Sequence, residues 1–186
     1  MGHPLVSGEP WYENDTVSRR IRFCQLAAAG YAVPRHGLLA DMKRLNAPLV
    51  MYTDAFAHCG EGKYLILPGY KHYDRQPHLF ASEYLGEIGK KPSVSLRTLW
   101  VGDYKAVIEY RSEVSWMSNV DGEYNVLSVR HAPEERARDL LRHPMYAIDF
   151  VRRVAVDLNV CPGLPREVVN AVGREELVRS YKEFVR

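Results

Sequence analysis

The chain has 186 residues, of which 46% are hydrophobic and 26% are charged, and its formal net charge is +2. This length and composition are typical of a single soluble globular domain with a core of its own. The small net charge gives no argument for nucleic-acid binding, and we expect no nucleic-acid partner. No apolar run is long enough to span a membrane and the N-terminus has no signal-peptide core, so we expect no membrane partner.

The three cysteines, Cys24, Cys59 and Cys161, are widely separated along the chain. Such spacing favours neither a disulfide framework nor a zinc site. We therefore expect a reducing compartment and a cytoplasmic protein.

The first structured element is expected after an N-terminal arm formed by residues 1–13. Asn14 or Asp15 is a suitable N-cap for a helix that ends near Gly30. The residues expected on the buried face of this helix are Val17, Ile21, Cys24 and Ala28.

Two strands are predicted next, at residues 48–53 (PLVMYT) and 63–67 (KYLIL), joined by a small-residue loop at 54–62. A strand, glycine loop and strand can fold over phosphate groups through main-chain N–H groups. The same pattern is also that of a plain hairpin, and both interpretations stay open.

The second half of the chain combines further strands with three helices. The predicted strands are 82–85, 94–101, 105–111 and 123–130, with a tight turn at Gly102-Asp103. The predicted helices are 133–142, 165–172 and 174–185, of which the first is amphipathic and charged. Together with the strands of the first half, these elements predict an α+β protein.

Residues 147–165 (AIDFVRRVAVDLNVCPGLP) contain two alternating segments that reverse at Arg152-Arg153. Such alternation predicts a hairpin of two half-buried strands. One face is expected to carry Ile148, Phe150, Val154, Val156 and Leu158. The other is expected to carry Asp149, Val151, Ala155, Asp157 and Asn159.

This hairpin also carries a candidate metal site. If residues of equal parity share a face, Asp149 and Asp157 are cross-strand neighbours. Two like charges so close repel each other unless a cation lies between them, which favours a hard, oxygen-binding metal, and Asn159 would add a neutral oxygen. The alternative is a surface hairpin whose acidic side chains are solvated.

The closing motif consists of an acidic residue, one residue, Asn, two residues and Pro-Gly, and it runs from Asp157 to Gly163. This motif and the order of the elements resemble the ATP-grasp superfamily of carboxylate–amine ligases, especially the ribosomal-protein-glutamate-ligase-like branch. The resemblance covers roughly residues 14–170 and is strongest in 82–165. It implies a single minimal ATP-grasp domain over 1–186, in which two α+β lobes (14–81 and 82–186) clasp a nucleotide between antiparallel sheets.

The resemblance implies roles for particular residues. Asp149, Asp157 and Asn159 match the magnesium ligands, with Asp157 where a glutamate is usual. The residues implied to bind ATP are Arg19, Lys63, the hinge residues Glu83, Tyr84 and Leu85, and Glu87 at the ribose. The residues implied near the reacting phosphate are Arg97, Arg111 and Asn119. For Arg97 and Arg111 the alternative is that each is an exposed strand residue that pairs with Glu109 or Glu113.

Two departures from the family pattern bear on activity. A second phosphate-binding lysine is usual where Tyr52 stands, and Arg19 stands at the first. The family's N-terminal acceptor domain has no counterpart, so a partner protein or a homo-oligomer is expected to supply it. The implied function is an ATP- and Mg²⁺-dependent ligase that joins a small-molecule or peptide carboxylate to an amine through an acyl phosphate. The alternative is a catalytically inactive ATP-grasp-like protein with a nucleotide-binding, structural or interaction role.

Overall fold

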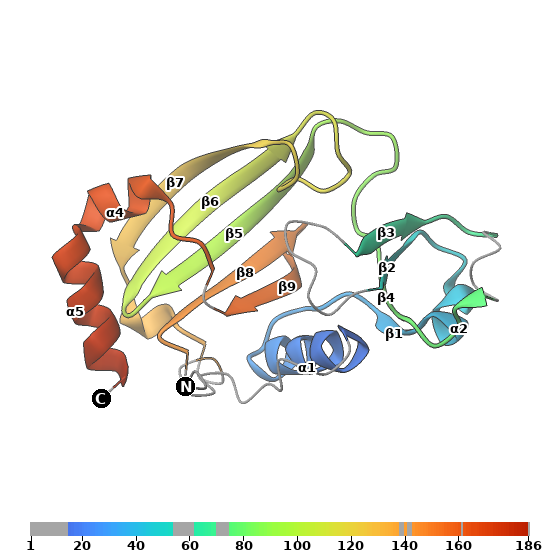
Figure 1. Cartoon of the computed structure of the whole chain (residues 1–186), viewed down its shortest axis with the longest axis horizontal. Helices are drawn as coiled ribbons and strands as arrows, with labels where there is room; N and C mark the ends of the chain where they lie inside the picture. Colours follow the sequence, from blue (N-terminus) through green and yellow to red (C-terminus); the bar gives the residue numbers. More distant parts are fainter. Residues whose placement is uncertain are drawn as a thin grey trace.

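The computed structural model describes residues 15–53, 62–69, 75–137, 140, 143–160 and 162–185. These residues form two antiparallel sheets flanked by helices, which confirms the predicted α+β class (Figure 1). The expected arm at 1–13 and most of the loop at 54–62 lie outside the described residues. No helix in the described part of the chain is long and apolar enough to cross a membrane.

The first sheet has the strand order β1-β4-β2-β3 and lies in the first half of the chain. Its strands are β1 (His36–Leu38), β2 (Leu49–Tyr52), β3 (Lys63–Ile66) and β4 (Phe80–Glu83). The strands predicted at 48–53 and 63–67 are confirmed as β2 and β3, whereas β4 begins two residues before the expected 82.

The central strand β2 is buried on both faces. Val50 and Tyr52 belong to a core cluster that includes residues of helix α1 (Asp15–Ala28). Leu49 and Met51 pack on the opposite side with helix α2 (Leu39–Met42), which is followed by a 3₁₀ turn η1 (Lys43–Leu45). Because successive strand residues point to opposite faces, a continuous apolar run is what a doubly covered strand requires.

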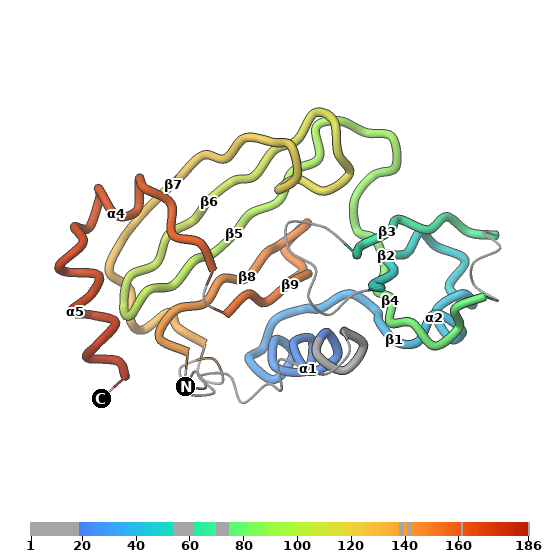
Figure 2. The backbone as a smooth tube through the Cα atoms, viewed as in Figure 1, coloured from blue at the N-terminus to red at the C-terminus, as the bar shows by residue number. Residues whose placement is uncertain are grey.

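The second sheet has the strand order β7-β6-β5-β8-β9. Its strands are β5 (Ser93–Val101), β6 (Tyr104–Ser112), β7 (Glu123–His131), β8 (Met145–Val151) and β9 (Val154–Val160). All five were predicted to within a few residues. Figure 2 shows the chain passing from β4 through residues 84–92 into β5, which is the connection between the two sheets.

The C-terminal helices α4 (Arg166–Val172) and α5 (Arg174–Val185) confirm the two predicted closing helices. Val168 and Leu177 pack in a cluster with Leu99, Ala106 and Ile108 of the second sheet. Figure 1 shows both helices beside β5, β6 and β7, at the end of the sheet away from β1–β4. Their apolar side chains therefore cover one face of the sheet.

Helix α1 begins and ends as predicted, with Gly30 beyond its end at a φ of 89°. Its predicted buried face is wrong. Cys24 and Ala28 are exposed, whereas Arg19, Phe23 and Leu26 are buried; Val17 is not among the side chains described. The helix contacts β9 and β4, and the larger side chains of Phe23 and Leu26 bury more apolar surface there than the small residues would.

The helix predicted at 133–142 is also wrong in the described residues. Pro133–Glu135 forms a 3₁₀ turn, η2, Arg136 is extended with a φ of −66° and a ψ of 134°, and Leu140 is again in 3₁₀ conformation, whereas residues 138, 139, 141 and 142 lie outside the described residues. The buried Arg136 guanidinium lies 5.7 Å from the ring centroid of Trp100 and 5.1 Å from that of Tyr146, and it donates to Gly102 O. These buried contacts stabilise the extended conformation against the local helical preference.

The β8–β9 hairpin confirms the predicted strand pair. Its two turn residues have φ values of 51° and 68°, which fits the twist of a two-residue hairpin loop. Asp149 lies opposite Asp157, as predicted.

The faces predicted for Val154, Ala155 and Val156 are wrong, because the register shifts between Asp149 and Phe150. Phe150 pairs with Ala155, so Val156 is an extra residue on β9. Ala155 therefore joins Ile148 and Leu158 in the core, and Val156 lines a cavity.

Candidate active site

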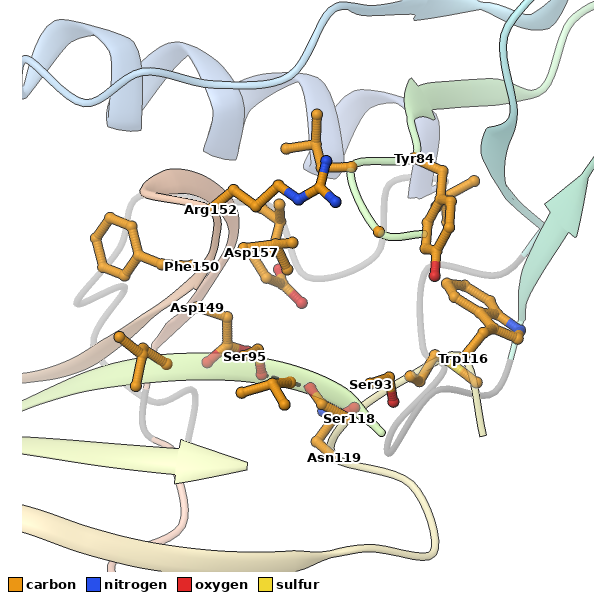
Figure 3. A pocket seen from close by; sticks show the side chains of 18 of the residues that line it. Tyr84, Ser93, Ser95, Trp116, Ser118, Asn119, Asp149, Phe150, Arg152 and Asp157 are labelled. Carbon is orange, nitrogen blue, oxygen red and sulfur yellow. Dashed lines mark hydrogen bonds between the residues drawn. The ribbon is translucent and has the colours of Figure 1, made fainter. Parts of the chain in front are cut away.

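A cavity of about 820 Å³ lies between the two sheets, a size usual for a small-molecule site. The first sheet contributes Val50, Tyr52, Lys63, Ser82 and Glu83, and the second contributes residues of β5, β6 and the β8–β9 hairpin. Figure 3 shows Asp149 and Asp157 on one side of the cavity, with Tyr84 and Trp116 on the other. The cavity therefore joins charged groups to an aromatic wall.

Arg97, Asp149 and Asp157 lie in one row across β5, β8 and β9. Arg97 Nε donates to Asp149 Oδ1 at 2.6 Å, and Arg97 Nη2 donates to Asp149 Oδ2 at 2.8 Å. Only 14% and 12% of the two side chains are exposed. Burial lowers the pKa of Arg97, but the hydrogen bonds and the charge of Asp149 outweigh it and raise the pKa overall, so the guanidinium is always charged.

Asp157 is buried and is held by two cations. It accepts hydrogen bonds from Arg19 Nη1 and, at 3.2 Å, from Lys63 Nζ. Burial alone would raise the pKa of Asp157, but the positive charges of Arg19, Lys63 and Arg22 outweigh it and hold the pKa well below its ordinary value. The carboxylate is therefore ionised at neutral pH, and it links α1 and β3 to β9.

Asn159 lies next to this row, and its Nδ2 donates to Asp149 Oδ2 at 3.3 Å. Two carboxylates and one amide oxygen are the donor types that Mg²⁺ prefers. The described residues contain no group of three His, Cys, Asp or Glu side chains that could hold a metal ion. The donor set fits Mg²⁺ on two conditions. Arg19 and Lys63 must exchange the Asp157 carboxylate for another anion, and the Asp149 oxygens, both bonded by Arg97, must be able to bind the metal as well.

Tyr52 is the direct cross-strand neighbour of Lys63. The Arg19 guanidinium lies 5.1 Å from the Tyr52 ring centroid, and the phenol oxygen lies 3.0 Å from Ser82 Oγ. Arg19 and Lys63 thus place two positive charges beside the position where the family has its second lysine.

The predicted hinge residues Glu83, Tyr84 and Leu85 and the predicted ribose ligand Glu87 all line the cavity. The Glu83 carboxylate accepts two hydrogen bonds from Arg35, at 2.9 and 2.7 Å. These hydrogen bonds are the main reason why the pKa of Glu83 is lowered. The main-chain N–H of Tyr84 donates to Pro48 O at 2.9 Å.

Glu87 is bonded by two cations at the mouth of the cavity. Lys90 Nζ lies 2.9 Å from Glu87 Oε2, and Arg152 donates to Glu87 Oε1. All three side chains are largely exposed, so these ion pairs contribute little to stability.

The three residues predicted near the reacting phosphate are separated in the structure. Neither arginine is among the residues that line the cavity: Arg97 binds Asp149, and Arg111 is exposed with its Nε 3.4 Å from Glu113 Oε1. Asn119 is exposed but lines the cavity from the loop at 113–122.

That loop also carries cavity residues that the sequence analysis missed. The hydroxyls of Ser95 and Ser118 are hydrogen-bonded to each other, and the Trp116 ring lies edge-on to the Tyr84 ring at 5.7 Å (Figure 3). A ten-residue connection between two strands is longer than a hairpin needs, and it was the available signal of a functional loop.

The structure is similar to the RiPP-associated ATP-grasp ligase of Chryseobacterium gregarium, solved with ADP and a leader and core peptide. The TM-score is 0.57 at 15% identity, over 97% of this chain and 60% of that chain. The chain has the ATP-grasp fold. This confirms the fold implied by the resemblance in the sequence.

Two further ATP-grasp structures are similar to this chain. The macrocyclase MdnB of Microcystis aeruginosa has a TM-score of 0.52 at 12% identity, over 92% of this chain and 60% of that chain. N5-carboxyaminoimidazole synthetase of Staphylococcus aureus, solved with ADP, has a TM-score of 0.51 at 12% identity, over 91% of this chain and 52% of that chain.

The chain spans 52 to 60% of the length of these three proteins. The sequence matches no family profile and no curated protein. At identities of 12 to 15%, the likeness concerns the ATP-grasp fold, and substrates are a separate question.

Proposed function

We propose that this chain is an ATP- and Mg²⁺-dependent ligase that forms an amide bond between a carboxylate and an amine, with an amino acid or peptide among its substrates. The observation that carries the proposal is the cavity between the two ATP-grasp sheets. Asp149, Asp157 and Lys63 line it, and Arg97 and Arg19, which are not among the lining residues, are bonded to Asp149 and Asp157. Structures similar to this chain contain ADP, and one of them contains a peptide.

The nucleotide would lie between a smaller lobe (14–81) and a larger lobe (82–186). The chain segment Glu83–Leu85 would hold the adenine, and Glu87 would bind the ribose hydroxyls. Glu87 can do so at small cost, because its present pairs with Lys90 and Arg152 are exposed.

The phosphates of ATP would bind the two cations that are now bonded to Asp157. Arg19 and Lys63 would neutralise the triphosphate, and Asp149, Asp157 and Asn159 would then be available to hold Mg²⁺. When bound, the metal would supply positive charge that offsets the charge of the transferred phosphoryl group. Cations and carboxylates would both stay paired during this exchange, so no buried charge would be left alone.

In the reaction, a carboxylate oxygen of the substrate attacks the γ-phosphorus and ADP leaves. The amine nitrogen then attacks the acyl carbon, inorganic phosphate leaves and the amine loses a proton. Arg97 suits the acyl phosphate because its planar guanidinium offers two parallel donors and keeps its charge. Arg111 and Asn119, which lie apart from Arg97 in this structure, are proposed for the same role.

The test is a calorimetric titration of ATP, with and without Mg²⁺, into the wild type, Asn159→Ala and the control Asn170→Ala. Asn159 is the best ligand to remove, because its loss leaves the ion pairs of Asp149 and Asp157 intact. We expect Mg²⁺-dependent binding that Asn159→Ala weakens about tenfold. Asn170, exposed on α4, should have no effect.

The second candidate is an inactive ATP-grasp-like protein with a structural or interaction role. It is favoured by Tyr52 in place of a lysine and by the ion pairs that already occupy Asp157. Absence of ATP binding at millimolar concentration would decide for this second function and against the ligase.

A further inference from the structure

Five carboxylates line the cavity, and four of them are paired with cations. Glu83 is bonded by Arg35, Glu87 by Lys90 and Arg152, Asp149 by Arg97, and Asp157 by Arg19 and Lys63. The fifth is Glu109, whose carboxylate has no hydrogen-bond or ion-pair partner in the part of the chain that the structure describes.

Glu109 lies in the middle of β6, half-buried, with Leu96 of β5 directly opposite. Residues two apart on a strand share a face, so Val107 and Val94 belong to the same face as Glu109 and Leu96. Leu96 and Val94 are 41% and 42% exposed, and both line the cavity with Val107. The unpaired Glu109 carboxylate is therefore surrounded by apolar side chains on its face of the sheet.

Three of the nearby cations of the chain are engaged with other carboxylates. Arg111, two residues along the same strand, is exposed beside Glu113, and both Lys90 and Arg152 bind Glu87. Arg153, at the β8–β9 turn, also lines the cavity, but its side chain is exposed. Since a half-buried carboxylate loses hydration when a ligand covers it, the ligand itself must bring a positive charge.

We infer that Glu109 binds an organic cation of the substrate, an ammonium or guanidinium group at the end of an alkyl chain. The alkyl chain packs on Leu96 and Val107 while the charged end pairs with the carboxylate. A lone carboxylate suits a monovalent organic cation, whereas a divalent metal needs several oxygen ligands.

Glu109 lies away from the residues proposed to act on the reacting phosphate. Glu109 is on β6 and Asp149 on β8, two strand spacings or about 10 Å apart. Glu109 is in register with Leu96 of β5 and Asp149 with Arg97, so the two side chains also project from opposite faces of the sheet. The cation is therefore a recognition group remote from the reacting atoms. The inference rests on the proposed ligase function and names its substrate class: a basic amino acid, or a peptide with a lysine or arginine side chain.

The test uses two probes that differ only in the charged group, Nα-acetyl-lysine methylamide and Nα-acetyl-norleucine methylamide. Binding is followed by NMR through the methyl signals of Leu96 and Val107. We expect the lysine probe to bind with a dissociation constant on the order of 1 mM. Glu109→Gln should weaken it about tenfold, and Glu109→Asp should restore part of the affinity. Glu123→Gln, an exposed carboxylate on β7, is the matched control.

Three outcomes would overturn the inference: equal binding of the lysine and norleucine probes, unchanged binding in Glu109→Gln, or displacement of the lysine probe by millimolar Mg²⁺. The ATP titration tests the ligase function separately from the cation site. If the wild type binds the lysine probe through Glu109 but binds no ATP, the ligase function is wrong and the cation site is retained. If ATP binds and the probe does not depend on Glu109, only the cation site is wrong.

Discussion

Gly102 lies where a hairpin, a buried arginine and the last helix meet. Its main-chain N–H donates to Pro144 O at 2.7 Å, and its carbonyl accepts a hydrogen bond from Arg136. A Cβ atom at this position would lie 2.7 Å from the main-chain carbonyl carbon of Ser180 on α5, and the φ of 53° is in the left-handed region. Glycine is therefore required both by the backbone conformation and by the packing of α5.

We predict that Gly102→Ala lowers the free energy of unfolding by roughly 2 to 4 kcal/mol, from the left-handed conformation and from overpacking. Gly30→Ala is the control, because Gly30 also has a positive φ but has nothing within 4 Å of its missing Cβ. It should cost about 1 kcal/mol. Urea denaturation measures both variants, and equal losses would show that contact with Ser180 is unimportant.

The β8–β9 hairpin shows what alternation can and cannot predict. The strands, the turn and the opposed Asp149 and Asp157 were predictable, because a two-residue turn sets the register locally. The bulge was not, because it depends on a distant contact. The N–H of Ala155 donates to Ala32 O at 2.8 Å, and this bond is made outside the hairpin.

The helices show the same division. The caps and glycines of α1, α4 and α5 mark where these helices begin and end, and the sequence predicted them. The buried face of α1 and the extended conformation of Arg136 were not predictable, because buried charged residues determine both. Arg19 and Arg136 are buried against partners that lie far away in the sequence.

The same limit applies to the candidate site. The hinge acids and the two aspartates were found from a motif, whereas the unpaired state of Glu109 depends on the positions of every neighbouring cation. The spacing of residues in the sequence does not predict which charged side chain will lack a partner in the folded protein.

At the hairpin turn, we predict that Arg153→Gly raises the free energy of unfolding by about 1 kcal/mol, because the left-handed conformation costs a non-glycine residue that much. Arg153 has a φ of 68° and an exposed side chain. Arg153→Ala removes the charge but keeps Cβ, and it should give no gain. If both variants gained equally in chemical denaturation, the stabilisation would come from the lost charge.

At the scale of the whole molecule, Asp157 is the charge that connects the two sheets. Its carboxylate, on the second sheet, is bonded by Lys63 of the first sheet and by Arg19 of α1. Removing one partner of a buried ion pair leaves the other charge buried and alone, which costs more than the pair contributes.

We predict that Asp157→Asn lowers the free energy of unfolding at pH 7 by roughly 3 kcal/mol. Because the pKa of Asp157 is lowered in the folded state, its stabilisation is complete above the ordinary aspartate pKa of about 3.9 and is lost as the pH falls below that value. The difference between wild type and variant should therefore shrink in acid.

Thermal unfolding between pH 7 and pH 2 measures this difference, with Asp41→Asn, an exposed acid on α2, as the control. A gap between wild type and Asp157→Asn that stayed constant down to pH 2 would contradict the assignment of the charge.

The pairing of Arg19 with Asp157 also has a consequence for synthesis, because the two residues are 138 positions apart. Ribosomes add about 5 to 20 residues per second, so α1 leaves the ribosome roughly 7 to 28 s before the strand that covers it. During that interval Phe23 and Leu26 have no β9 against which to pack. The nascent chain can cover Phe23 with Phe80 of β4, but the side of α1 that packs on β9 stays exposed to chaperones until the last strand has been made.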